Sequence, residues 1–241
     1  MNAKMKIQAA AICSLLLASA ACSSRPGSGG GAGVVSTGGG AAPAAAPAGG
    51  GVVSASDKPL DVMLKATRAQ LDAKSYRANV KNTASNGTTT AMVIEYAAPD
   101  RYHMVTHSQA GGRDTALEYV ILGKDSFMKM NGGEWRRFPA DMSQMISAFR
   151  NPKFIEELAK ASDLKLVGPD TLDGAPMLVY EYTINNVMGM KMTSRARTWV
   201  AVADGLPRRS ESEGEYSGVK TKTEMTVSDY NSDIKIEAPI K

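Results

Sequence analysis

The chain has 241 residues, of which 43% are hydrophobic and 22% charged, and its formal net charge is +4. Its Lys and Arg residues form no basic tract interleaved with aromatic side chains, so nucleic acid is not an expected partner. Only two cysteines are present, too few for a disulfide framework or a cysteine-ligated metal site. Stability must therefore come from an apolar core.

The first 21 residues have the composition of an export signal. Lys4 and Lys6 precede an apolar stretch from Ile7 to Ala21, the order typical of a secretory signal peptide. At 15 residues, this stretch is shorter than the roughly 20 that a transmembrane helix needs. Removal of residues 1–21 takes away two lysines and no acids, which lowers the net charge to about +2.

The end of this segment resembles the lipobox of bacterial lipoproteins. Residues 15–22 read Leu-Leu-Leu-Ala-Ser-Ala-Ala-Cys, with Ser19 where that motif usually has Leu. The resemblance implies cleavage between Ala21 and Cys22, a diacylglyceryl group on the Cys22 sulfur and acylation of the new amino terminus. A plain signal peptide would instead leave Cys22 as a lone thiol in an oxidising compartment. Two or three acyl chains on one residue make release from a membrane very slow.

The residues after Cys22 predict a tether. Residues 23–56 are almost wholly Ser, Gly, Ala, Pro and Val, with one charge at Arg25, and such a segment buries too little apolar surface to fold. Its 34 residues would typically reach about 30 to 35 Å. No strand precedes its glycines and no Lys-Ser/Thr follows them, so they are not a phosphate-binding loop.

Residues 57–241 are expected to form one domain that begins with a helix. Over residues 57–73, Asp57 is placed to cap the helix, Pro59 suits its first turn, and apolar residues recur at helical spacing. The period then changes to two, and Asn86-Gly87 predicts a hairpin turn between the first two strands. Five strands of a meander are expected near residues 76–80, 92–96, 101–106, 115–122 and 126–130.

The second half repeats this order of helix and then strands. Residues 141–161 predict two short helices that meet at Asn151-Pro152. Further strands are expected at residues 164–167, 177–184, 195–203, 208–216 and 220–230. The predicted fold class is α+β, dominated by one long antiparallel sheet.

Short motifs in both halves resemble the lipoprotein-carrier superfamily, which includes LolA, LolB and the LppX/LprG lipoproteins. They occur in the family's order and cover nearly all of residues 57–241; they are Ala98-Pro99-Asp100-Arg101-Tyr102, Leu122-Gly123-Lys124, Gly133-Glu134-Trp135, Val167 to Gly174, Trp199, Asp204-Gly205-Leu206-Pro207, and Tyr230-Asn231 with Ala238-Pro239. The resemblance implies a sheet curled into a half-open barrel, with helices lidding a concave apolar face that holds acyl chains. LolA-type carriers have an Arg where Ala98 stands here, so their release mechanism is not implied. A lipid anchor also favours the LolB or LppX/LprG side.

Methionine is the abundant side chain of the candidate cavity. Twelve remain after residue 21, and this flexible, polarisable side chain can repack around different acyl chains, although it is equally a core filler. The residues expected to line the cavity are Met92, Ile94, Tyr96, Met104, Leu117 and Tyr119. Met188, Met190 and Met192 surround Gly189 and predict either an apolar loop at the cavity mouth or an irregular strand.

No catalytic or metal-binding set emerges from the sequence. His103 and His107 are the only histidines, and on a strand residues four apart lie about 13 Å from each other, too far to share one ion. No nucleophile, base and orienting group can be assembled from motifs. We therefore expect no cofactor, no metal and no enzymatic activity.

The functional hypothesis is an envelope lipoprotein that binds a lipid or a lipidated protein non-covalently. The alternatives are an RseB-like sensor or assembly lipoprotein that binds a protein partner and, more remotely, a hydrolase. Ser23 is not the Asp that signals inner-membrane retention in Gram-negative lipoproteins. In a two-membrane envelope the expected location is therefore the outer membrane, facing the periplasm.

Overall fold

The computed structural model describes residues 52–139, 142, 162–187 and 190–240. Cys22, Met188 and the two helices expected within residues 141–161 therefore lie outside the described residues, apart from Met142. The described part contains one helix, α2, and eleven strands. Their bounds are α2 Pro59–Asp72, β1 Ser75–Ala84, β2 Thr89–Ala97, β3 Arg101–Ala110, β4 Arg113–Leu122, β5 Asp125–Met130, β6 Arg136–Arg137, β7 Ser162–Leu172, β8 Ala175–Val187, β9 Met190–Ala201, β10 Pro207–Tyr216 and β11 Val219–Ser228.

Helix α2 confirms the helix predicted at the start of the domain, but not its cap. Pro59 occupies the first turn, where its missing N–H costs no hydrogen bond. The Asp57 carboxylate does not cap the helix; it accepts a hydrogen bond from the Ser54 backbone N–H at 2.8 Å, and Lys58 is the residue that precedes the helix. Val53, assigned to the tether by composition, is 7% exposed and packs in the core, because its side chain meets the helix and the sheet.

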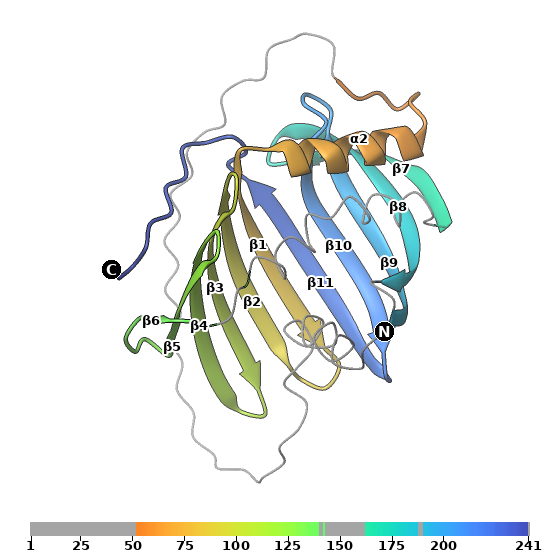
Figure 1. The fold of residues 1–241 in the computed structure, drawn as a ribbon. Helices are drawn as coiled ribbons and strands as arrows, with labels where there is room; N and C mark the ends of the chain where they lie inside the picture. The colour runs from red at the N-terminus through yellow and green to blue at the C-terminus, as the bar shows by residue number, and fades with distance from the viewer. Residues whose placement is uncertain (1–51, 140–141, 143–161, 188–189, 241) are drawn as a thin grey trace, which may run out of the picture.

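All eleven strands form one antiparallel sheet, in the order β6-β5-β4-β3-β2-β1-β11-β10-β9-β8-β7 (Figure 1). Each half of the chain is a meander, and the pairing of β1 with β11 joins the two meanders in the middle of the sheet. β6 and β7, which are consecutive in sequence, therefore lie at opposite edges. The sheet is strongly curved but does not close into a barrel, since its two edge strands do not pair with each other.

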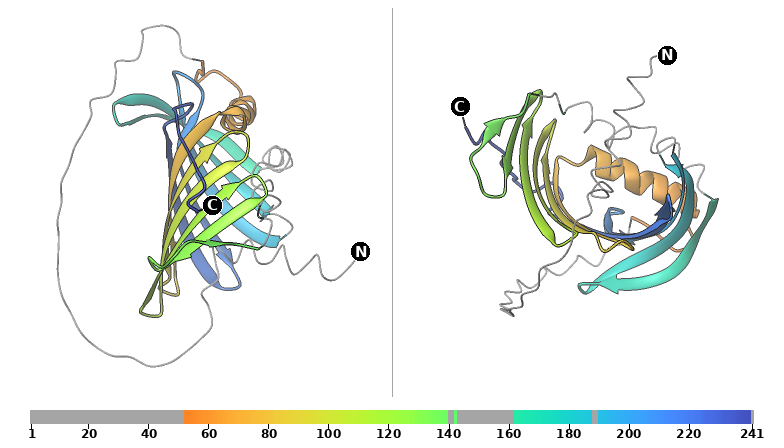
Figure 2. Two further views of the ribbon diagram at one scale, coloured as in Figure 1. Left: turned by 60° about the vertical axis from the view of Figure 1, so that its left-hand side comes forward. Right: turned by 90° about the horizontal axis from the view of Figure 1, so that it is seen from below.

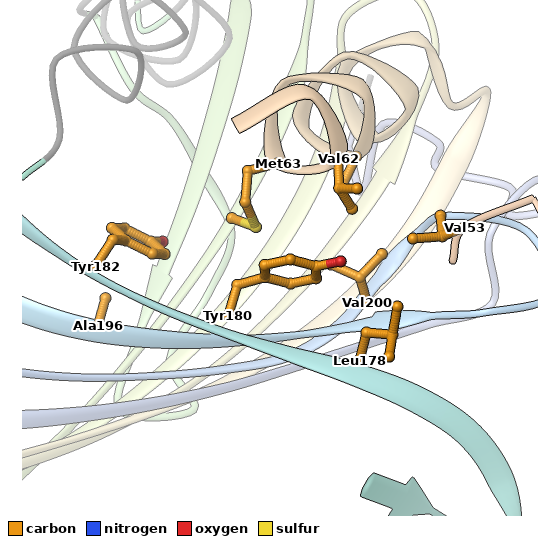
Figure 3. Close-up of a cluster of buried hydrophobic side chains, with 9 residues drawn as sticks. Val53, Val62, Met63, Leu178, Tyr180, Tyr182, Ala196 and Val200 are labelled. Carbon is orange, nitrogen blue, oxygen red and sulfur yellow. The ribbon is translucent and has the colours of Figure 1, made fainter. Parts of the chain in front are cut away.

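The curvature gives the sheet a concave face, and α2 lies on it (Figure 2). Val62, Met63 and Ala66 of α2 pack against a cluster on β8 and β9. In that cluster Tyr180 and Val200 are fully buried, and Figure 3 shows the Tyr180 ring beneath Met63 and Val62. This cluster is the largest core of the described domain, and it covers the concave face of β8 and β9.

Candidate functional site

The strand register brings all six residues predicted to line a cavity onto one face of the sheet. Ile94 on β2 lies opposite Met104 on β3, which in turn lies opposite Tyr119 on β4. Met92 and Leu117 share a second such row, and Tyr96 lies in a third. Because residues two apart on a strand share a face, the six side chains form one block across β2, β3 and β4.

That face is the concave one. Tyr180 and Val200 contact α2, which fixes the concave side of β8 and β9. The register of the neighbouring antiparallel strands, followed from β9 through β10 and β11, places Ala78 of β1 on the same concave side. Ala78 lies opposite both Val227 and Ile94. The predicted block therefore continues the surface on which α2 rests, but on the N-terminal meander, beyond the strands to which α2 packs.

Tyrosines form one end of this block, and the sequence analysis missed most of them. Ring centroids of Tyr230 and Tyr76 are 6.1 Å apart, those of Tyr76 and Tyr96 5.1 Å, and those of Tyr96 and Tyr102 5.0 Å. Tyr96 and Tyr102 are buried together with Ile121, and burial raises the pKa of Tyr102, so this hydroxyl stays neutral. The alternation of Tyr102 with Met104 along β3 was the sequence signal that could have added Tyr102 to the predicted lining residues.

Met142 also contacts this end of the block. It is the one described residue between Ala140 and Ala161, and it packs on the cluster of Tyr96, Tyr102 and Ile121. Of the mouth residues proposed from sequence, Met190 and Met192 lie in the first residues of β9, where Met190 pairs with Val187. Met190 and Met192 therefore have the backbone conformation of a strand. Met188 lies outside the described residues.

The two faces of the sheet differ in charge. On β1 to β5 almost all described concave positions are uncharged, namely those from Tyr76 to Ala84, Thr90 to Tyr96, Tyr102 to Ser108, Thr115 to Ile121 and Ser126 to Met130. The exception is Arg113, which is exposed at the start of β4 on the face of Thr115. The intervening convex positions carry a chain of ionic contacts. Since charged groups are costly to bury without a partner, this segregation favours an apolar occupant on the concave side only.

The convex chain of contacts crosses five strands, and His103 is at its centre. Arg77 contacts Glu95 at 2.8 Å, His103 Nδ1 contacts Glu95 at 2.9 Å, His103 Nε2 contacts Glu118 at 3.0 Å, and Lys129 contacts Glu118 at 2.5 Å. The Arg77 guanidinium also contacts Asp229 at 2.7 Å. His103 is thus a half-buried link between two carboxylates, a role that the sequence did not indicate.

The geometry around His103 fits an imidazolium. A neutral imidazole has one N–H donor, whereas both ring nitrogens of His103 face carboxylate oxygens. Burial lowers the pKa of His103, but the hydrogen bonds to Glu95 and Glu118 outweigh it and raise the pKa above the ordinary 6.5. The pKa of Glu95 is lowered, chiefly by its hydrogen bond with His103.

The stability of the domain is expected to fall as the pH rises above about 6.5. A raised pKa in the folded state means that the His103 contribution is complete below about 6.5 and is lost as the pH rises through the folded pKa. Urea unfolding at a series of pH values measures this dependence. His103→Gln should flatten it, and His107→Gln, on the same face of β3, should leave it in place. An unchanged slope in His103→Gln would contradict the assignment.

A second charged cluster lies on the convex side of the C-terminal meander. Glu181, 5% exposed, contacts Arg195 at 2.6 Å, Arg197 at 2.8 Å and Lys165 at 3.3 Å. Hydrogen bonds from Arg195 and then Arg197 lower the pKa of Glu181 to about 2. This carboxylate therefore stays charged over the physiological range and ties β7, β8 and β9 together.

A hollow of about 930 Å³ lies on the convex side of β11, β1, β2, β3 and β4. Ala91 and Val93 contribute apolar surface to it, while Lys81, Asp114 and Glu224 carry charges of both signs at its margin. It is open to solvent, and most of its lining residues face the side opposite the predicted block, although Met92, Thr90, Ser108 and Thr115 also contribute to it. We regard the concave face as the stronger candidate for an apolar ligand, because its apolar side chains are continuous across β1 to β4 and its described cations on β1 to β6, Arg113 and Arg136, lie at its margin.

Other kinds of site find little support in the described residues. No described helix is both long enough and apolar enough to cross a bilayer. Within the described ranges, no three or more His, Cys, Asp or Glu side chains come together in a way that could hold a metal ion.

Comparison with known proteins identifies the fold. A scan of protein families and a search of curated protein sequences find no match to this chain. The structure resembles LprF from Mycobacterium bovis, with 12% identity, 76% of this chain and 97% of LprF covered, and a TM-score of 0.57. It also resembles the Mycobacterium tuberculosis lipoprotein LppX, with 14% identity, coverage of 74% and 98%, and a TM-score of 0.55. The resemblance in fold to LppX/LprG-type proteins that the sequence motifs predicted is confirmed.

Proposed function

We propose that this chain, which has the fold of LprF and LppX, is an envelope lipoprotein that binds a lipid or a lipidated protein on its concave face. The acyl chain would lie against β1 to β5, and no bond would be made or broken. The observation that carries the proposal is the largely apolar concave face, which holds Ile94, Met104 and Tyr119 in one row. The description of LppX as a lipoprotein is consistent with it.

Burial of an acyl chain supplies the affinity in this proposal. Removing apolar surface from water contributes about 25 cal/mol per Å², or about 0.8 kcal/mol per CH₂ group, before the entropy of binding is deducted. Met92, Met104 and Met128 on the concave face are only partly buried, so they retain surface for such contact. Their flexible side chains suit chains of different length.

The path of the chain between β6 and β7 is part of the same proposal. This connection joins opposite edges of the sheet, and Met142, near its start, packs on the concave cluster of Tyr96, Tyr102 and Ile121. We infer that the connection crosses the concave face and shields a bound chain from water. Met188, beside the first strand residues of β9, would contribute to the mouth.

The anchor completes the proposal. Cys22 would carry the acyl groups, residues 23–51 would hold the domain away from the membrane, and Val53 would fix the end of this tether to the core beneath α2. In a two-membrane envelope, Ser23 favours the outer membrane.

Mass spectrometry of the full chain with Cys22→Ser tests the binding function, because this variant has no covalent acyl group. Lipid extracted from the protein, purified from cells without detergent, is expected at close to one molecule per chain. Solvent extraction should then leave a protein that takes up a fluorescent fatty acid. A preparation that contains no lipid and takes up no fatty acid would refute the proposal.

A second candidate is the binding of a protein partner, and the convex hollow favours it. Val93 lines this hollow and is 38% exposed, and charged residues of both signs line it as well. A photocrosslinker placed at Ala91 should capture one stoichiometric protein in cells if this function applies. The same crosslinker yields no single product if lipid binding is the whole function.

A further inference from the structure

A row of uncharged polar side chains crosses the concave face at the end away from the tyrosines. The register places them opposite one another on six neighbouring strands, from β4 through β3, β2, β1 and β11 to β10. In that order they are Thr115, Ser108, Thr90, Asn82, Thr223 and Ser212. We call them the polar row.

Two residues of the polar row are buried, the other four are partly exposed, and the row is partly hydrogen-bonded within itself. Asn82 is 5% exposed and Thr90 7% exposed. The Asn82 carboxamide donates to Thr223 Oγ1 at 2.8 Å, and the Thr90 and Ser108 hydroxyls are 3.2 Å apart. The hydrogen bond to Thr223 is the single one described for the Asn82 side chain, which has two N–H groups and an acceptor oxygen. A sheltered carboxamide with unused hydrogen-bonding capacity suits a polar ligand group.

An amphiphile can span the distance from this row to the tyrosine cluster. From Asn82 to Tyr76 on β1 is six residues, or about 20 Å along a strand. The side chains between them on the same face are apolar on β1 and β2, namely Ala78, Val80, Met92 and Ile94. A chain lying along the strands would therefore have apolar contact over its length and polar contact at one end.

The absence of charge decides which polar group fits. Arg113, which is exposed at the start of β4, shares this face two residues beyond Thr115. Around Asn82, Thr90 and Thr223 the described concave positions carry no cationic side chain. A phosphate or carboxylate placed there would lose hydration without gaining a counter-ion. Hydroxyl groups, in contrast, both donate to and accept from Ser, Thr and Asn side chains.

We propose that the polar row is a headgroup subsite, and that the ligand is an acyl lipid with a neutral, hydroxyl-bearing headgroup such as a monoacylglycerol. This inference rests on the proposed function, since it names the class of lipid that the concave face selects. The hydroxyls would bond to Asn82, Thr90 and Ser108, and the acyl chain would run toward Tyr96.

Competition binding on the delipidated full chain with Cys22→Ser tests the subsite. Monooleoylglycerol, oleate and oleoyl lysophosphatidate are compared as displacers of a fluorescent fatty acid. We expect monooleoylglycerol to bind at least about tenfold more tightly than the two anionic lipids, the size expected for one or two net hydrogen bonds. The double variant Thr90→Val with Ser108→Ala should remove this preference, with little change in affinity for oleate.

Thr89→Val is the matched control, because Thr89 neighbours Thr90 on β2 but faces the convex side. It should retain the preference. Thr223→Val is a second test that leaves β2 untouched, and it should also reduce the preference. A merely structural role of the row would alter stability without changing headgroup selectivity, so thermal unfolding is measured alongside.

The outcomes separate the two proposals. If none of the three lipids binds, the proposed function fails. If all three bind and the anionic lipids bind as tightly as monooleoylglycerol, or if the double variant keeps the preference, the subsite is refuted while the lipid-binding function stands.

Discussion

Ile94→Glu is expected to weaken acyl-ligand binding by more than about 100-fold. Ile94 lies between Ala78 and Met104 on the concave face, where no described side chain could neutralise a carboxylate. Burying an unpaired charge against an acyl chain costs on the order of 3 kcal/mol or more, and 1.4 kcal/mol corresponds to a factor of ten in the dissociation constant. Titration with a fluorescent fatty acid measures the loss.

Val93→Glu provides the matched control for this result. Val93 precedes Ile94 on β2, faces the convex side and is 38% exposed, so the same charge there stays hydrated. We expect its ligand affinity to remain within a factor of about three of the parent protein. Circular dichroism and thermal unfolding establish that both variants are folded.

Met104→Glu repeats the test from β3, since a single variant could lose binding through local unfolding. Met104 lies opposite both Ile94 and Tyr119. Two folded concave variants that still bind normally, or a convex variant that loses binding as completely, would show that the ligand does not lie on this face.

Cys22→Ser is expected to move the protein from the membrane fraction to the soluble fraction. Each buried CH₂ group of an acyl chain contributes about 0.8 kcal/mol to membrane binding, so removing two or three chains abolishes stable attachment. Fractionation of cells and the intact mass of the protein measure the change. Incorporation of a labelled fatty acid such as palmitate should be lost at the same time.

Two comparisons make the Cys22 result specific. Cys13→Ser changes the other cysteine, within the predicted signal peptide, and should leave both mass and location unchanged. Lipid binding by the purified Cys22→Ser protein should equal that of the delipidated wild-type domain, since Val53 begins the core 31 residues after Cys22. A Cys22→Ser protein that remains in the membrane at an unaltered mass would refute the anchor.

If both results hold, the protein meets lipid in two separate ways. Cys22 would hold it covalently at one membrane, while the concave face would bind a second lipid reversibly. The two contacts would be independent, because the predicted tether of residues 23–56 separates them. Mutation of Cys22 should therefore leave lipid binding on the concave face intact, and mutations on the concave face should leave the anchor intact. Each prediction thus serves as a check on the other.

Period-two alternation in the sequence was sufficient to place the candidate ligand-contacting residues on one face. Met92, Ile94 and Tyr96 share a face because successive side chains on a strand point to opposite sides, and the turn at Asn86-Gly87 fixed the neighbouring strand. The alternation also predicted the antiparallel meanders. Local patterns determine these features because they depend on residues close together in the chain.

The position of His103 between two carboxylates could not be predicted from the residues near it in the sequence, because both carboxylates lie on neighbouring strands. The sequence placed His103 on a strand, but its contacts come from Glu95 on β2 and Glu118 on β4. Each partner is selected by the register of an antiparallel pair, and a shift of one residue would turn its side chain to the other face. The same holds for Glu181, whose three cationic partners come from β7 and β9.

The sequence by itself predicted ten of the eleven described strands and their alternation, with β6 missed, and it pointed to Cys22 as the candidate anchor. The tertiary structure alone decided that β1 pairs with β11, that α2 covers β8 and β9 instead of the predicted block, and that the polar row continues from Asn82 to Thr223. These features join segments more than 100 residues apart. Such pairings are fixed by the burial and hydrogen bonding of the whole sheet, which no local stretch of sequence contains.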